Sequence, residues 1–275
     1  MNRYYFTLIL LLCLTIGVQA QHLILLHTND THSRIEPLPE TDKYNPDLGG
    51  VVRRAAYVDK MRSENKNVLL FDAGDFLQGT PYFNMFKGEV EIEAMNLLKY
   101  DAATLGNHEF DYGMDVLVNI VKKAKFPIVC TNYDFSDTEI ADIIKPYLVI
   151  YKDGVKIGIV GANVSPVGLI ASINYKGMKF LSPTPVINKT AEMLRNDLKC
   201  DMVICLSHLG IQNDLELAEN SRNIDLIIGG HSHTFMSKPS IRNNLDSKEV
   251  LVFQTNGRGV FVGRIDVELE KIKKN

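Results

Sequence analysis

Five short apolar runs, each ending abruptly in polar residues, limit what this chain can fold into. The runs are LILLHTNDTH (23–32), NVLLFDAGD (67–75), DAATLGNHE (101–109), DMVICLSH (201–208) and DLIIGGHSH (225–233). Continuous apolar runs of this length are typical of strands that are buried on both faces of a sheet. The pattern therefore predicts a sheet-rich α/β fold.

The segments between these runs have helical spacing or turn signals. Residues 49–65, 83–100 and 184–198 repeat apolar side chains at the spacing of an amphipathic helix. Asp153-Gly154 and Asn256-Gly257 each lie between alternating runs, which predicts hairpins over 147–162 and 250–270. There is no internal repeat and no linker rich in Pro, Gly or Ser. We therefore expect one domain, a sandwich of mixed β-sheets with antiparallel edges, flanked by helices.

The N-terminus has the pattern of a secretory signal peptide. Arg3 precedes the apolar run 4–18, and small residues stand at Val18 and Ala20. We expect cleavage after Ala20, so that residues 1–20 are the signal peptide and residues 21–275 the folded domain. The alternative is an uncleaved N-terminal anchor, although the run is shorter than the ~20 residues that span a bilayer. No later run is long enough, so the mature chain is expected to have no membrane span.

Charge and cysteine content exclude several classes of protein. The chain has 30 Lys and Arg against 33 Asp and Glu, a net charge of −3, which gives no electrostatic footprint for nucleic acid. Beyond the signal peptide it keeps an odd number of cysteines, Cys130, Cys200 and Cys205, in apolar surroundings. We therefore expect buried free thiols rather than a disulfide framework.

Metal-competent side chains collect where the predicted strands end. They are Asp30, His32, Asp75, Asn107, His108, His208, His231 and His233. Ligand sites in open α/β sheets form at the carboxyl edge of the strands. A single histidine at a strand end is usually structural, but five of them beside two aspartates and an asparagine indicate a common site.

The donor set indicates the kind of metal. Carboxylates, imidazoles and an amide oxygen together suit Zn, Mn, Fe or Co better than Ca or Mg. The number of ligands exceeds one tetrahedral site, which favours two divalent ions. Two such ions with two aspartates keep a net positive charge, enough to hold a phosphate dianion and to acidify bound water.

The same residues carry a family resemblance. DTH (30–32), GDFLQGTP (74–81), GNHEFDYG (106–113), SHLG (207–210) and GGHSHT (229–234) resemble the successive motifs of the calcineurin-like metallophosphoesterases. Their spelling is most similar to the 5′-nucleotidase branch, and LGGVVRRAAYV (48–58) extends the match. The resemblance covers residues 23–267 and implies a metallophosphatase-type sandwich of two mixed sheets flanked by helices.

The resemblance also implies a role for each site residue. One ion would be held by Asp30, His32, Asp75 and His233, and the other by Asp75, Asn107, His208 and His231. Asp75 would therefore bridge both ions. The nucleophile would be a metal-bound hydroxide, with no covalent enzyme intermediate.

His108 resembles the catalytic histidine, and Asp111 can hydrogen-bond its ring, which would favour the protonated imidazole. Three other side chains, Glu109, His27 and His22, are not included in the predicted site. Glu109 is interpreted as a carboxylate favoured by the positive end of a helix dipole. His27 and His22 are assigned no role in the chemistry.

The chain departs from the family at its C-terminus. Secreted 5′-nucleotidases continue into a domain that recognises the nucleoside, whereas this sequence ends soon after the last predicted strand. We therefore expect only the catalytic domain, acting on nucleotides or small phosphate esters alone or beside a separately encoded specificity domain. A 2′,3′-cyclic-nucleotide or other phosphodiesterase and a metal-holding subunit with vestigial catalysis are the alternatives. The signal peptide and motifs favour secretion to a bacterial periplasm or envelope.

Overall fold

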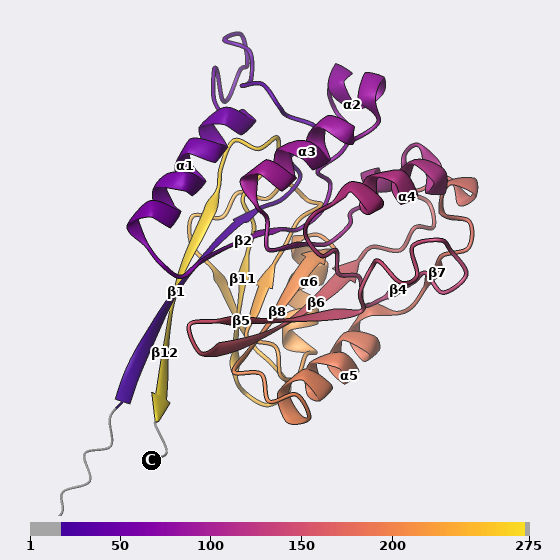
Figure 1. Ribbon diagram of the computed structural model, residues 1–275. Coiled ribbons are helices and arrows are strands. Elements are labelled where there is room, and N and C mark those ends of the chain that lie inside the picture. Colours follow the sequence, from indigo (N-terminus) through magenta and orange to yellow (C-terminus); the bar gives the residue numbers. More distant parts are fainter. Residues whose placement is uncertain (1–17, 273–275) are drawn as a thin grey trace, which may run out of the picture.

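Two β-sheets pack face to face in the computed structural model, which describes residues 18–272 (Figure 1). The four-stranded sheet has the order β12 (Gly263–Ile272), β1 (Val18–Thr28), β2 (Val68–Asp72), β3 (Ala102–Ala103). The six-stranded sheet has the order β10 (Ser240–Asn243), β11 (Glu249–Phe253), β9 (Leu226–Ile228), β8 (Met202–His208), β6 (Val155–Asn163), β5 (Tyr147–Lys152). A further pair joins β4 (Tyr133–Asp134) to β7 (Lys179–Phe180).

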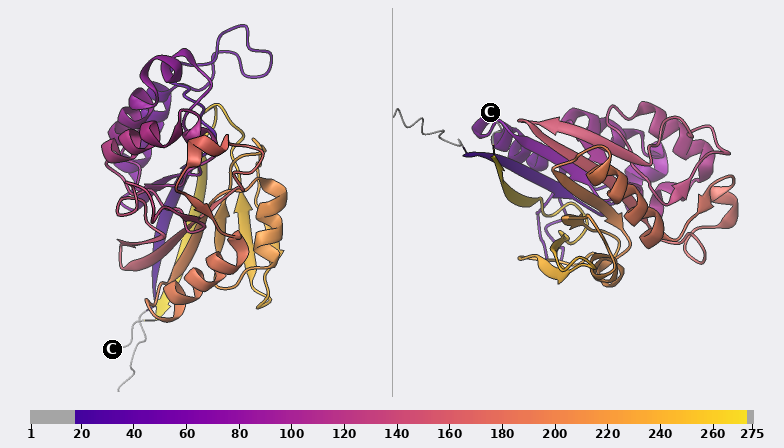
Figure 2. Two further views of the ribbon diagram at one scale, coloured as in Figure 1. Left: turned by 90° about the vertical axis from the view of Figure 1, so that its right-hand side faces the viewer. Right: turned by 90° about the horizontal axis from the view of Figure 1, so that it is seen from below.

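Helices cover both outer faces of this sandwich (Figure 2). The helices are α1 (Val51–Glu64), α2 (Pro81–Phe86), α3 (Glu89–Leu98), α4 (Gly113–Lys123), α5 (Pro183–Asn196) and α6 (Ile211–Glu219), with 3₁₀ turns η1 (His108–Phe110) and η2 (Ser172–Tyr175). Helices α1, α3 and α4 share a core with the four-stranded sheet, and α5 and α6 share one with the six-stranded sheet. The prediction of two mixed sheets flanked by helices is confirmed.

The strands are apolar on both faces because both faces are covered. In β1, Leu23 and Leu25 lie in the core between the sheets, whereas Ile24 and Leu26 face the helices. All four are fully buried. Because side chains alternate along a strand, an apolar run without polar gaps is what two buried faces require.

The parallel strands end at one level, and this places the polar residues that follow them. Thr28 of β1 is paired with Asp72 of β2, which is paired with Ala103 of β3. In the other sheet, Asn163 of β6 is paired with His208 of β8. The antiparallel strands β12, β5 and β10 lie at the edges, as the sequence indicates.

Two local predictions need correction. The helix expected over 83–100 is two helices, because Lys87 and Gly88 have φ values of 53° and 95° and end α2 before α3 begins. The hairpin predicted over 147–162 is confirmed as β5 and β6. The hairpin predicted over 250–270 is wrong, since β11 and β12 belong to different sheets.

The residues between β11 and β12 cross from one sheet to the other, and we call residues 254–262 the crossing segment. Asn256 has a φ of 67°, so the Asn-Gly signal marks a local turn. The backbone groups of the crossing segment form hydrogen bonds with other loops instead of closing a hairpin. Asn29 Nδ2 donates to Asn256 O at 2.5 Å, and Arg258 N donates to Asp30 O at 2.6 Å. The crossing segment therefore holds the loop that follows β1.

The remaining predictions concern the termini and the cysteines. Cys130, Cys200 and Cys205 are buried free thiols, as expected. Residues 1–17 of the predicted signal peptide lie outside the described residues, and β1 begins at Val18. Among the residues described, no helix combines the length and the apolar character that crossing a membrane requires.

Candidate metal centre

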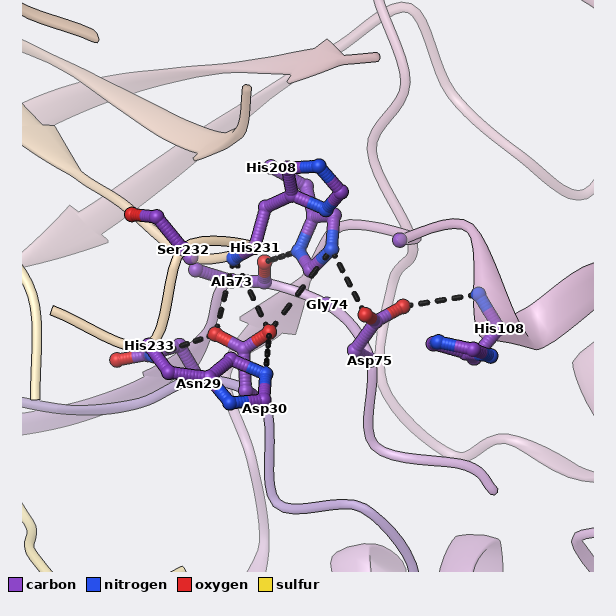
Figure 3. A network of polar contacts seen from close by, with 12 residues as sticks. Asn29, Asp30, Ala73, Gly74, Asp75, His108, His208, His231, Ser232 and His233 are labelled. Carbon is purple, nitrogen blue, oxygen red and sulfur yellow. Dashed lines mark hydrogen bonds and ion pairs between the residues drawn. The ribbon is translucent and has the colours of Figure 1, made fainter. Parts of the chain in front are cut away.

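Left-handed backbone recurs in the loops that carry the candidate ligands. Five candidate ligands have a left-handed backbone, namely Asp30 (φ 50°), His32 (47°), Asp75 (55°), His231 (73°) and His233 (50°). Non-glycine residues adopt this conformation at an energetic cost, and such strain concentrates at functional sites. Each turn follows the carboxyl end of a buried strand, and Figure 3 shows the side chains of Asp30, Asp75, His231 and His233 gathered in one region.

Asp30, His32 and His233 form one convergent group. Each offers one ligand atom, and these atoms lie within 4.8 Å of one another. His233 Nε2 is 3.3 Å from Asp30 Oδ1, and the Nε2 atoms of His32 and His233 are 2.9 Å apart. The Nδ1 of His32 donates to Leu77 O at 3.3 Å, which directs its Nε2 lone pair into the group.

Asp75, His208 and His231 form the second group, with ligand atoms again within 4.8 Å of one another. His208 Nε2 lies 3.0 Å from Asp75 Oδ2 and 4.0 Å from Asp30 Oδ1, so the two groups adjoin (Figure 3). Burial lowers the pKa of His208, but the charge and hydrogen bond of Asp75, the charge of Asp30 and the bond to Ala73 O together outweigh it, and the pKa rises to about 10. A divalent cation would supply the positive charge that the proton supplies here.

The donor atoms fit divalent metals. The Oδ1 of Asn107 is buried and has no hydrogen-bond partner among the described residues. Asn107 is the N-cap residue of η1, but its side chain makes no cap bond. Within the described residues the Nε2 of His208 makes no aligned hydrogen bond and has only its 3.0 Å ion-pair contact with Asp75, while its Nδ1 donates to Ala73 O at 2.7 Å. Unpaired buried donors and acceptors are costly unless something binds them. A ligating imidazole fixed through its other nitrogen is the usual arrangement at metal sites.

His108 stands beside these groups with a different orientation. Its Nδ1 is 2.9 Å from Asp111 Oδ2, and its ring centroid is 5.4 Å from that of His32. The backbone N–H of His108 donates to Asp75 Oδ1 at 2.9 Å. The hydrogen bond to Asp111 raises the pKa of His108, against burial, which lowers it. The pairing expected from the sequence is therefore present, with the ring partly exposed.

Comparison with known proteins identifies the family to which this arrangement belongs. Residues 23–235 match the calcineurin-like phosphoesterase family. The chain belongs to that family. The motif resemblance is thereby confirmed, and the match spans all seven candidate metal ligands together with His108 and Asp111.

Relatives of this phosphoesterase include 5′-nucleotidases. It is 33% identical to the 5′-nucleotidase of Homo sapiens over 273 residues, covering 92% of this chain and 47% of the relative. The 5′-nucleotidase precursor of Thermus thermophilus superposes with a TM-score of 0.84 at 35% identity, covering 90% of this chain and 51% of the other. The NAD nucleotidase NadN of Haemophilus influenzae gives a TM-score of 0.83 at 28% identity, covering 93% and 50%. The chain thus spans about half the length of these relatives.

Sequence reasoning missed the residue that holds the phosphoesterase loops together. The sequence pattern gives Glu109 only a dipole role, yet its side chain is 1% exposed and accepts three backbone N–H groups. These come from Asp75 at 3.0 Å, from Leu77 at 3.1 Å and from Gly106. Burial raises the pKa of Glu109 to about 8, and the charge of Asp75 adds to the rise. No local pattern distinguishes such a carboxylate from a helix-start glutamate.

Two amides, also missed, hold the other loops. Gln254 Nε2 donates to Gly230 O at 2.6 Å, while its Oε1 accepts from Ser232 Oγ at 3.0 Å and from Thr234 N. Asn29 Oδ1 accepts the N–H of Thr255 at 2.9 Å, and its Nδ2 donates to Asp30 Oδ2 at 2.6 Å. The crossing segment thereby joins the loop before His233 to the loop that carries Asp30.

Glu109 offers a stability test that is independent of catalysis. Replacement by Ala leaves three buried N–H groups without an acceptor, so we expect the free energy of unfolding to fall by about 3–5 kcal/mol. Urea denaturation in the presence of a chelator measures this without a contribution from bound metal. Glu93→Ala removes an exposed carboxylate from α3 and is expected to change stability by no more than about 0.5 kcal/mol. Equal losses in the two variants would contradict the assignment.

Proposed function

We propose that this chain is a secreted, dinuclear-metal phosphomonoesterase that hydrolyses nucleotides or related small phosphate esters. The observation that supports it most is the convergence of two ligand groups, around Asp30 and Asp75, beside the His108–Asp111 pair. Asn107 completes the second group through its unpartnered Oδ1. Asp75 is proposed to serve both ions, since its charge acts on His32 of the first group as well as on His208 of its own.

The proposed chemistry divides between the metals and the chain. When bound, two divalent ions, of Zn, Mn, Fe or Co, neutralise phosphoryl oxygens and acidify water at the site. The chain orients the ions through the imidazoles fixed by Leu77 O and Ala73 O. His108 holds a proton, because Asp111 accepts from Nδ1 and stabilises the imidazolium. Its Nε2–H is then free to donate to a phosphoryl oxygen or to the leaving oxygen.

We further propose that recognition of the nucleoside comes from a separate domain. The 5′-nucleotidases from Homo sapiens and Thermus thermophilus are about twice the length that this chain matches. Secretion to a bacterial periplasm or envelope is proposed from the apolar run near the N-terminus. A relative that is 32% identical, the snake venom 5′-nucleotidase of Naja atra, is named as a venom protein, which supports a secreted location.

Phosphate release by the purified chain tests the proposal. Metal-free protein resupplied with Mn, Co or Zn should hydrolyse an aryl phosphate, and activity should disappear again when a chelator is added. Offering AMP, a sugar phosphate and a 2′,3′-cyclic nucleotide beside it separates the substrate classes. Similar rates on all monoesters would support specificity supplied elsewhere, and a clear preference for AMP would refute that part. Preference for the cyclic nucleotide would refute the monoesterase assignment, and metal-independent release would refute the mechanism.

A further inference from the structure

A chain of buried polar groups runs from helix α1 to the loop that carries Asp75. It begins at Arg54, the second arginine of the GGVVRRA motif, to which the function proposed above assigns no role. Arg54 is 7% exposed, and its guanidinium interacts with the hydroxyl of Tyr100. Tyr100 lies two residues after the end of α3 and is 4% exposed. The Nε and Nη2 atoms of Arg54 have no hydrogen-bond partner among the described residues, and a buried charge is costly unless nearby polar groups compensate it.

The next links lie at the ends of the two central strands. The hydroxyl of Tyr100 is 2.8 Å from Thr28 Oγ1, and Thr28 Oγ1 donates to Asp72 Oδ2 at 2.5 Å. Asp72 Oδ1 accepts the backbone N–H of Gly74 at 2.9 Å. Thr28 and Asp72 are both fully buried.

The two ends of this series of polar groups fix which groups donate and which accept. Arg54 can only donate, and the Asp72 carboxylate accepts from both Thr28 and Gly74. The Thr28 hydroxyl gives its proton to Asp72, so the Tyr100 hydroxyl must donate to Thr28. Both hydroxyls therefore donate in the same direction, toward Asp72, and the Tyr100 oxygen is left facing the positive charge of Arg54. Such aligned chains polarise their members and strengthen each bond.

Gly74 lies between the two groups of candidate ligands. Its carbonyl accepts the N–H of Asp30 at 2.9 Å, and the next residue is Asp75. The neighbouring Ala73 donates its N–H to Thr28 O at 2.9 Å and accepts from His208 Nδ1 at 2.7 Å. Gly74 has a φ of 87°, and a methyl group built on it would lie 2.6 Å from Gly106 N. A small rotation of this loop would therefore displace ligands of both groups.

We propose that Arg54, Tyr100, Thr28 and Asp72 form a positioning relay that fixes the loop at Gly74 and thereby sets the geometry of both metal sites. The inference rests on the proposed assignment of Asp30 and Asp75 as ligands. The relay acts through the backbone, because none of its four side chains is among the candidate ligands. Loss of a buried partner one layer outside a metal site typically weakens metal binding ~10–100-fold.

Tyr100→Phe tests the relay, because it removes one oxygen and keeps the ring. Tyr133→Phe is the matched control, since Tyr133 is 3% exposed and its hydroxyl donates to Val164 O at 2.6 Å, outside the relay. Each variant loses one buried hydrogen bond, so similar losses of stability are expected. Only Tyr100→Phe should bind Co²⁺ about tenfold more weakly in competition with a chelator. Only Tyr100→Phe should alter the visible spectrum of the Co²⁺-loaded protein.

A second measurement tests the relay independently of the assignment of the metal ligands. In metal-free protein, the amide N–H of Gly74 should exchange with solvent faster in Tyr100→Phe than in wild type or Tyr133→Phe, because its acceptor Asp72 is less firmly held. Unchanged exchange, or the same Co²⁺ affinity and spectrum in both variants, would overturn the relay. Wild type that binds no Co²⁺ would overturn the metal assignment, while the exchange result would still decide whether the relay holds the loop.

Discussion

Replacing Asp75 by Ala is expected to remove both metal ions from this phosphoesterase, a larger effect than the loss of any other single ligand. Asp75 is 2% exposed and contacts His208 at 3.0 Å, while its other oxygen accepts the N–H of His108. Under the proposed assignment each ion loses a bond to the same carboxylate. Metal affinity should therefore fall by more than the ~10–100-fold that follows loss of an outer partner. Metal content after exhaustive dialysis, measured by plasma mass spectrometry, gives the result directly.

Two further variants show whether the effect belongs to a bridging ligand. Asn107→Ala should lose one ion and keep the other, because Asn107 is assigned to one site alone. Asp115→Ala removes an exposed aspartate of α4 and should keep both. Asp75→Ala protein with the metal content of wild type would contradict the bridging role. Equal losses in Asp75→Ala and Asn107→Ala would reduce Asp75 to an ordinary ligand of one site.

Replacing His108 by Ala is expected to lower kcat by about 10²–10⁴-fold while both ions stay bound. The ring lies beside the ligand groups, 5.4 Å from the His32 ring, but its Nδ1 is engaged by Asp111 rather than directed at a metal. Steady-state rates on an aryl phosphate, together with metal content, separate a proton-donating role from a ligating one.

The controls for His108 follow from its contacts. Asp111→Asn keeps the ring in place but removes the charge that stabilises the imidazolium, so an intermediate loss of kcat is expected. His22→Ala removes a histidine that is paired with Asp266 on the surface at 3.3 Å and should leave kcat unchanged. Activity of His108→Ala equal to wild type would remove this residue from the mechanism. Loss of an ion would make it a ligand.

The candidate ligands can be predicted from the sequence because each lies at the end of a recognisable strand or soon after it. A buried strand is marked by an unbroken apolar run, and the residue after it must lie at the sheet edge. The sequence therefore predicts that Asp30, His32 and Asp75 lie at one sheet edge, and the backbone bonds from His32 to Asp75 and from Asp30 to Gly74 bring their loops together there. Their left-handed backbone carries no comparable signal, since nothing in DTH or GDF demands it.

The residues that hold the ligand loops cannot be predicted in the same way, because their hydrogen-bond partners are distant in the sequence. Gln254 bonds to Gly230 and Ser232, and its own neighbours say nothing of this. The Asn256-Gly257 pair predicts a hairpin because local turn chemistry is indifferent to which sheet the next strand joins. The interpretation of Glu109 is incomplete for a related reason, since a carboxylate at the start of a helix serves the dipole equally well whether it faces water or a buried loop.

The crossing segment also dictates when the site can exist during synthesis. Strand β1 pairs with β12 from the opposite end of the chain, with Leu25 beside Ile265, and Asp30 O accepts the N–H of Arg258. A nascent chain that ends at Phe253 already has both aspartates and all the strand-end histidines, yet it lacks the bonds that the crossing segment makes to the loop that carries Asp30. Contacts so distant in the sequence form late and slowly. The order of events is therefore set by topology, because the loop that carries Asp30 gains its full support only after β12 has been synthesised and has paired with β1.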